Sequence, residues 1–127
     1  MKLILFGIFC ILSLIEADII DTRTIEVSDM IQCCSKTIIM EFCEAPKKAK
    51  IELWDYFKVF PDTLLHSMET ENVTKYSFKW SDEKIFDVKP ILKIHVECKD
   101  GTIFDEKYDY TETKPTMISQ NVKVLNS

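Results

Sequence analysis

Glycine, histidine and arginine are scarce in this chain of 127 residues. It has two glycines and two histidines, and its single arginine is Arg23. So few glycines cannot form a glycine-rich phosphate loop, and a serine or cysteine triad would need His66 or His95 as its base. His66 lies in a strand-like run and His95 on the polar face of another, where we expect plain surface histidines. These shortages argue against an enzyme, and we predict no catalytic residues and no cofactor.

Basic residues are outnumbered by acidic ones. Sixteen lysines and arginines stand against 21 aspartates and glutamates, which gives a formal net charge of −5. An acidic protein without a basic face is a poor candidate for nucleic-acid binding, so we predict no nucleic-acid partner. The composition is 46% hydrophobic and 29% charged, which favours a packed globule over a disordered chain.

One long hydrophobic run is present, and it lies at the N-terminus. Lys2 precedes the apolar run Leu3–Ile15, and the small residue Ala17 follows it closely. A positive charge, an apolar block of about thirteen residues and a small residue form the layout of a secretory signal peptide. The block is too short for a ~30 Å hydrocarbon core, which takes roughly twenty residues, so no transmembrane span is expected. We predict that residues 1–17 are cleaved and that about 110 residues are secreted as one domain.

The cysteines predict a disulfide-bonded domain. Cys10 leaves with the signal peptide, and an even number remains in an oxidising compartment, so two structural disulfides are expected. Three connectivities are possible, although a bridge between the adjacent Cys33 and Cys34 would be strained. A metal site is disfavoured because the chain has no Cys-x-x-Cys pair. The disulfide candidates are Cys33, Cys34, Cys43 and Cys98.

The sequence also contains a glycosylation sequon, which is relevant because the chain is expected to be exported. Asn72-Val73-Thr74 matches the acceptor pattern for an N-linked glycan, which has meaning only in a secreted chain and implies an exposed turn. Asn72 is therefore a candidate glycosylation site.

Hydrophobic residues alternate with polar ones along most of the chain. This period of two is typical of half-buried β-strands. Asp100-Gly101 is the strongest hairpin signal, because a type I′ turn needs positive φ, and a short helical turn fits residues 81–86. About seven short strands at regular spacing predict an antiparallel β-sandwich. The alternation leaves open which faces Trp54 and Trp80 take relative to the core. The apolar residues that share one face of a strand are Ile38, Met40 and Phe42; Ala49, Ile51 and Leu53; Tyr76, Phe78 and Trp80; Leu92, Ile94, Val96 and Cys98; Phe104, Tyr108 and Tyr110; and Val122 and Val124.

An ordered set of short motifs between Thr37 and Asp100 resembles the nematode transthyretin-like family. The match consists of a strand ending in a cysteine, a proline soon after it, a Leu-aromatic-Asp, a Pro-Asp-x-Leu-Leu, a Pro-x-Leu-x-Ile, a second cysteine and an Asp-Gly. In this chain these are Cys43, Pro46, Leu53-Trp54-Asp55, Pro61–Leu65, Pro90–Ile94, Cys98 and Asp100-Gly101.

The resemblance implies a secreted, all-β, transthyretin-like sandwich of two antiparallel sheets without known catalysis. We assign that domain to residues 37–127, after an N-terminal extension over residues 18–36. The chain departs from the family at Val96, where a histidine is usual; His95 is one position earlier, on the opposite strand face, so no histidine role is carried over. Cys33 and Cys34 stand upstream of the family's usual cysteines, which implies a disulfide pattern private to this chain.

One loop is more apolar than a surface connection needs to be. Tyr56, Phe57, Val59 and Phe60 lie between two expected strands, where loops are normally polar. Their side chains either fold back to close one end of the sandwich or form an exposed patch that contacts a partner. These four residues are the candidate binding site.

Export, the family resemblance and this loop predict a secreted, non-catalytic recognition protein. Its partner would be an extracellular or host protein, or a lipid at a cell surface. The alternative is a carrier of a small apolar ligand, held in an internal cavity or at an oligomer interface. The sequence leaves the oligomeric state open.

Overall fold

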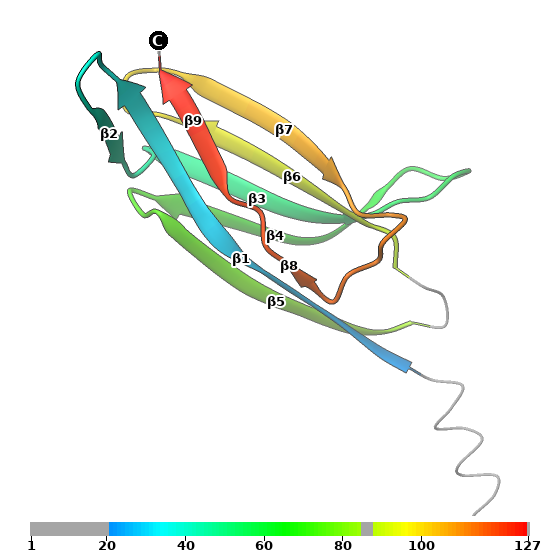
Figure 1. Ribbon diagram of the computed structural model, residues 1–127. Coiled ribbons are helices and arrows are strands. Elements are labelled where there is room, and N and C mark those ends of the chain that lie inside the picture. Colours follow the sequence, from blue (N-terminus) through cyan, green and yellow to red (C-terminus); the bar gives the residue numbers. More distant parts are fainter. Residues whose placement is uncertain (1–20, 85–87, 127) are drawn as a thin grey trace, which may run out of the picture.

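The computed structural model describes residues 21–84 and 88–126. The expected signal peptide, residues 1–17, lies outside the described residues. Within these ranges the chain forms nine β-strands in two sheets (Figure 1). The strands are β1 (Asp21–Lys36), β2 (Glu41–Glu44), β3 (Lys48–Asp55), β4 (Thr63–Glu71), β5 (Lys75–Lys84), β6 (Pro90–Glu97), β7 (Ile103–Asp109), β8 (Met117–Ile118) and β9 (Val122–Asn126).

The first sheet is organised around β1. This strand pairs antiparallel with β5 over its first part and with β2 over its end, while β8 and β9 pair parallel with it. Residues 21–36 therefore belong to the sandwich, which starts upstream of the boundary at residue 37 that the sequence analysis expected. β1 belongs to the sheet because its side chains alternate between core and surface. Ile25, Val27 and Ile31 are buried, and the residues between them are polar or half-buried.

The second sheet has the antiparallel order β4-β3-β6-β7. The alternation predicted for β3 and β6 is confirmed, because Ile51, Leu53, Leu92 and Ile94 are all buried. Between β6 and β7 the chain turns at Asp100-Gly101 as expected, but the turn is not of type I′, which needs positive φ at both central residues. Gly101 has a φ of 96°, whereas the φ of Asp100 is not positive, and the Gly101 amide donates to the Cys98 carbonyl over 3.0 Å.

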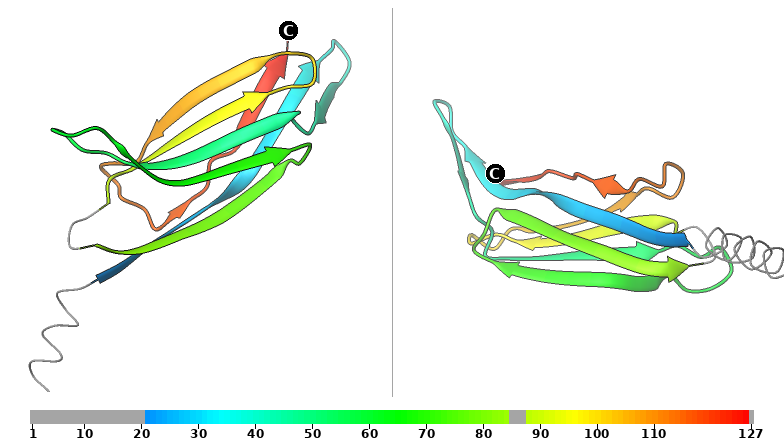
Figure 2. Two further views of the ribbon diagram at one scale, coloured as in Figure 1. Left: turned by 180° about the vertical axis from the view of Figure 1, so that it is seen from behind. Right: turned by 90° about the horizontal axis from the view of Figure 1, so that it is seen from below.

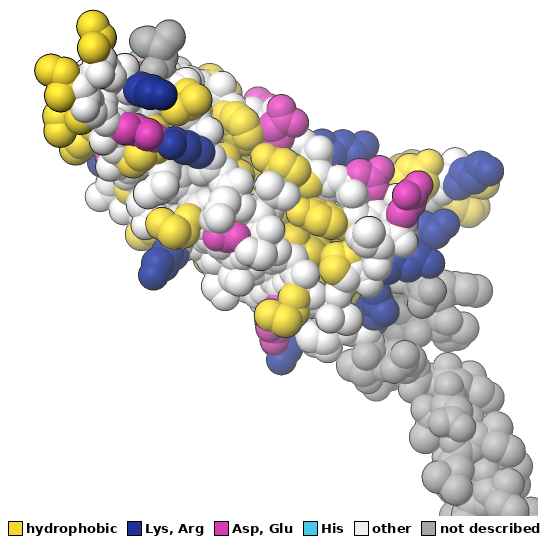
Figure 3. All heavy atoms as spheres, in the orientation of Figure 1, with side chains coloured by type: hydrophobic (Ala, Val, Ile, Leu, Met, Phe, Trp, Pro, Cys, Tyr) yellow, Lys and Arg dark blue, Asp and Glu magenta, His cyan; other side chains and the backbone are white. Residues whose placement is uncertain are grey.

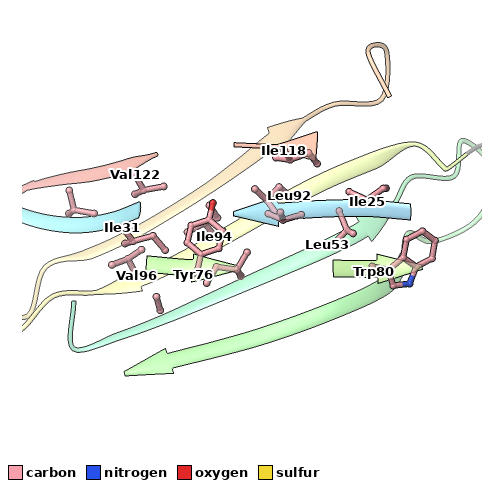
Figure 4. Close-up of a cluster of buried hydrophobic side chains, with 14 of the residues drawn as sticks. Ile25, Ile31, Leu53, Tyr76, Trp80, Leu92, Ile94, Val96, Ile118 and Val122 are labelled. Atoms are coloured by element: carbon pink, nitrogen blue, oxygen red, sulfur yellow. The ribbon is translucent and has the colours of Figure 1, made fainter. Parts of the chain in front are cut away.

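The core fills the space between the two sheets. Figure 2 shows the two layers in the view from below, and Figure 4 shows the buried side chains between them. Ile25 and Ile31 of β1 and Tyr76 and Trp80 of β5 face a row of aliphatic side chains from the second sheet. The Tyr76 hydroxyl donates to the Gln120 carbonyl over 2.9 Å, so its one polar atom is satisfied. Burial is the main reason why the pKa of Tyr76 lies far above its ordinary value, and the negative charge of Asp29 raises it further. The facing row is Leu53, Leu92, Ile94 and Val96.

Two local expectations were wrong. Residues 38–42 do not place their apolar side chains in the core; β2 begins only at Glu41, and residues 37–40 form the turn that joins it to β1. The helical turn expected over residues 81–86 is not formed up to Lys84, because β5 stays extended through its pairing with β1; its remainder falls among residues outside the described ranges. The described residues form nine strands, whereas about seven were expected. The additional strands are β1, which was assigned to an extension, and β8, which is only two residues long and too short to show an alternation.

No helix in the described ranges is long and apolar enough to cross a membrane.

Candidate functional site: two apolar ends of the sandwich

The loop between β3 and β4 projects from one end of the molecule, where Figure 1 shows it beyond the strands of the second sheet. Val59 is 84% exposed and Phe60 is 70% exposed, while Tyr56 and Phe57 are each 38% exposed. Of the two arrangements left open by the sequence, these side chains take the one facing solvent. Their role in binding remains a prediction.

The base of this loop is held by hydrogen bonds. The Tyr56 amide donates to the Lys89 carbonyl over 2.9 Å. In return, the buried carboxylate of Asp55 accepts from the Lys89 amide, also over 2.9 Å. At the rim, the Phe57 amide donates to the Asp62 carboxylate over 3.4 Å. The apolar tip is therefore presented from a fixed base, which reduces the ordering cost of binding.

The turn between β1 and β2 forms a second apolar end, which we call the hairpin tip (residues 37–42). Ile38 and Ile39 are 105% and 93% exposed, and Met40 and Phe42 are more than half exposed. The Thr37 amide donates to the Met40 carbonyl over 2.8 Å, closing the turn. Figure 3 shows hydrophobic side chains gathered at this end, and Figure 1 shows the β3–β4 loop at the other.

Sequence reasoning missed the hairpin tip because it assigned these residues to a buried strand face. A signal was present: Ile38, Ile39 and Met40 are three consecutive apolar residues, whereas a half-buried strand alternates. A run that cannot put all its side chains on one face favours a turn that exposes them.

The disulfides connect Cys33 with Cys98 and Cys34 with Cys43. Successive residues of a strand point to opposite faces, so adjacent cysteines reach different partners. Cys33 joins β1 to the end of β6 in the other sheet, and Cys34 staples β1 to β2 below the hairpin tip. Glu41 lies beside the second bridge, but sulfurs held in a disulfide are not thiolate metal ligands.

The histidines have structural partners. His66 stacks on Phe78 with 4.5 Å between ring centroids. His95 lies on the outer face of β6, with Nδ1 2.5 Å from the Asp105 carboxylate and Nε2 3.5 Å from the Glu97 carboxylate. The hydrogen bond to Asp105, helped by the one to Glu97 and opposed by partial burial, raises the pKa of His95 above 6.5.

Replacing Asp105 with asparagine is expected to lower the pKa of His95 towards 6.5, the value of an unperturbed histidine. In the wild type, the raised pKa adds stability that is fully present below the unfolded-state pKa and lost as pH rises through the folded-state pKa. The gain is small because the His95 and Asp105 side chains are 40% and 70% exposed, and solvent screens exposed pairs. An NMR titration of the His95 ring checks this. An unchanged pKa in Asp105→Asn would show that Asp105 is not the main cause.

A shallow hollow of about 410 Å³ lies on the first sheet between β1 and β5, bordered by Ser28, Met30 and Ser77. It opens to solvent along the sheet surface, unlike a carrier cavity, which encloses most of its ligand. Among the described residues, the most exposed large apolar side chains lie instead at the two ends: Ile38, Ile39 and Val59.

These features define a disulfide-stapled β-sandwich that presents apolar side chains at both ends. The sequence model of the transthyretin-like family (TTR-52), a nematode family, matches residues 42–118, and the chain belongs to this family. The resemblance seen in the motifs is thereby confirmed, as is the two-sheet fold it implied. Comparisons with curated proteins and with solved structures found no match. Members of the family are generally non-catalytic, and a disulfide-bonded member is consistent with secretion.

Proposed function

We propose that this protein is a secreted, non-catalytic recognition module that binds an extracellular protein through the loop between β3 and β4. The observation that carries the proposal is the exposure of Val59 and Phe60 at the tip of a loop with a fixed base. Exposed apolar clusters of this kind mark contact sites. Family membership and the two disulfides support the extracellular setting.

The energetics of the loop suit a specific contact. Burying one such side chain is worth about 1.5–3 kcal/mol, so Val59 and Phe60 together supply about 3–6 kcal/mol before ordering costs. Aromatic residues near the centre of an interface often dominate its affinity. Phe60 is thus the expected anchor, and Phe57 of the same loop is 38% exposed.

Replacing Val59 and Phe60 together with serine is expected to weaken partner binding by about a hundredfold, which corresponds to a loss of about 3 kcal/mol. The melting temperature should stay unchanged, because both side chains face solvent. The measurement is affinity capture of the mature protein from host and source-tissue extracts, followed by titration of the captured partner.

The matched control is the double variant Ile103→Ser/Met117→Ser, which removes two exposed apolar side chains away from the loop. It should bind like the wild type. Equal loss of binding in both double variants would show nonspecific adhesion and contradict the proposal. Vesicles that bind the wild type while no protein is captured would assign the loop to lipid. A small apolar ligand that co-purifies regardless of the loop variants would favour the carrier alternative.

A further inference from the structure

The turn between β4 and β5 holds the sequon Asn72-Val73-Thr74 in a well-defined position. The Asn72 amide donates to the carbonyls of Pro46 and Lys47, over 3.1 and 3.3 Å. The Thr74 carbonyl accepts from the Ile31 amide over 2.7 Å. Backbone contacts on both sides therefore fix this turn against the connection before β3 and against β1.

The side chains of the sequon remain accessible. Asn72 is exposed with a φ of 54°, a left-handed conformation that asparagine tolerates better than most residues. Val73 is 46% exposed. The hydrogen bonds from Asn72 to Pro46 and Lys47 are made by its backbone amide, so a substituent on its side-chain amide would not disturb them.

We infer that Asn72 carries an N-linked glycan, which is added during export and sterically blocks the neighbouring sheet edges from pairing with another chain. The inference rests on the export that the proposed function requires. In the transfer step, the Asn72 Nδ2 atom forms a bond to the anomeric carbon of the sugar. The bond from that carbon to the pyrophosphate of a lipid-linked oligosaccharide breaks, and the amide gives up one proton. No electrons are exchanged.

The position of the turn explains what the glycan does. β4 is the last strand of the second sheet, and β5 is the last strand of the first sheet beside β1. The 72–74 turn connects them, so one glycan stands next to two open edges. Unpaired edge strands are templates for pairing with another chain, and a bulky, hydrated saccharide obstructs that approach.

The glycan also leaves the proposed contact loop free. The β4–β5 turn and the β3–β4 loop lie at opposite ends of β4, and Figures 1 and 2 show them at opposite ends of the sandwich. Modification and recognition are therefore compatible on one molecule.

The test expresses the full chain in eukaryotic cells and analyses the secreted protein by intact mass and peptide mapping. We expect a sugar mass that an amidase specific for N-glycans removes, converting Asn72 to aspartate. Thr74→Ala should abolish this mass although Asn72 and the Thr74 backbone carbonyl remain. Thr74→Ser, which restores a hydroxyl, should keep it. Secreted wild type without a sugar mass would overturn the inference.

Sedimentation velocity tests whether the glycan prevents association through the sheet edges. Folded protein freed of its glycan should contain a larger oligomer fraction than the glycosylated protein at the same concentration, and an identical distribution would overturn this role. Val59→Ser/Phe60→Ser should keep its glycan, so failure of recognition and failure of glycosylation are separate results. Retention of the chain inside the cells would contradict the export on which both depend.

Discussion

The free energy of unfolding is expected to fall by about 4 kcal/mol when Cys33 and Cys98 are both replaced by alanine, according to the chain-entropy relation for cross-links. The bridge spans a sequence separation of 65 residues and joins β1 of the first sheet to the residue after β6 in the second. Without it, the unfolded chain gains the entropy of a large open loop. Both cysteines are almost wholly buried, so the loss of packing adds to the effect. Urea unfolding, monitored by fluorescence, measures the change in the free energy of unfolding.

The second disulfide provides the control. Cys34 and Cys43 are nine residues apart, and the same relation gives a loss of about 2.5 kcal/mol for Cys34→Ala/Cys43→Ala. This pair staples a hairpin to its neighbour strand and does not connect the two sheets. A loss equal to or larger than that of the Cys33–Cys98 variant would contradict the assignment of the inter-sheet bridge as the main cross-link.

Replacing Leu53 with alanine is expected to lower the free energy of unfolding by about 3–5 kcal/mol, the range for leucines in well-packed cores. Leu53 is fully buried on β3, between β4 and β6, and its cross-strand neighbour Leu92 is fully buried as well. Truncation leaves a cavity that a sheet paired on both sides cannot close. Thermal and urea unfolding both report the change.

A leucine at the surface is the matched control for this change. Leu125 on β9 is 61% exposed, and Leu125→Ala should change stability by no more than about 0.5 kcal/mol. A similar loss in the two variants would mean that the core does not lie between the sheets as described.

Much of the sandwich could be predicted from local pattern. The alternation is strict in β3, and in β6 from Leu92 onward, so each side chain's face there follows from its position in the sequence. Ile51 and Ile94 point inward, and Lys50 and Lys93 point outward. The Asp100-Gly101 turn was predictable for a similar reason, since the required positive φ selects glycine. The candidate loop was recognisable because its aromatic content conflicts with its place between two strands.

The rest depended on contacts between distant segments. β1 was taken for part of an N-terminal extension because the motifs that resemble the family begin at residue 37. Only its end pairs with a strand close to it in sequence, β2, whereas its partners β5 and β9 lie about 50 and 90 residues further along the chain. The two tryptophans show the same limit. Trp80 is 9% exposed in the core, whereas Trp54 lies on the outer face with the Lys93 ammonium 4.3 Å from its ring centroid.

By itself the sequence determined the class of fold, the strands with strict alternation, the family and the residues available for disulfides. These follow from period, turn chemistry and short motifs, which act over a few residues. Only the tertiary structure decided that Cys33 pairs with Cys98 and Cys34 with Cys43, that the β3–β4 loop faces solvent, and that Ile38 and Ile39 form an exposed tip. The physical reason is that burial and pairing depend on which surfaces meet once both sheets have formed, and no local pattern specifies that.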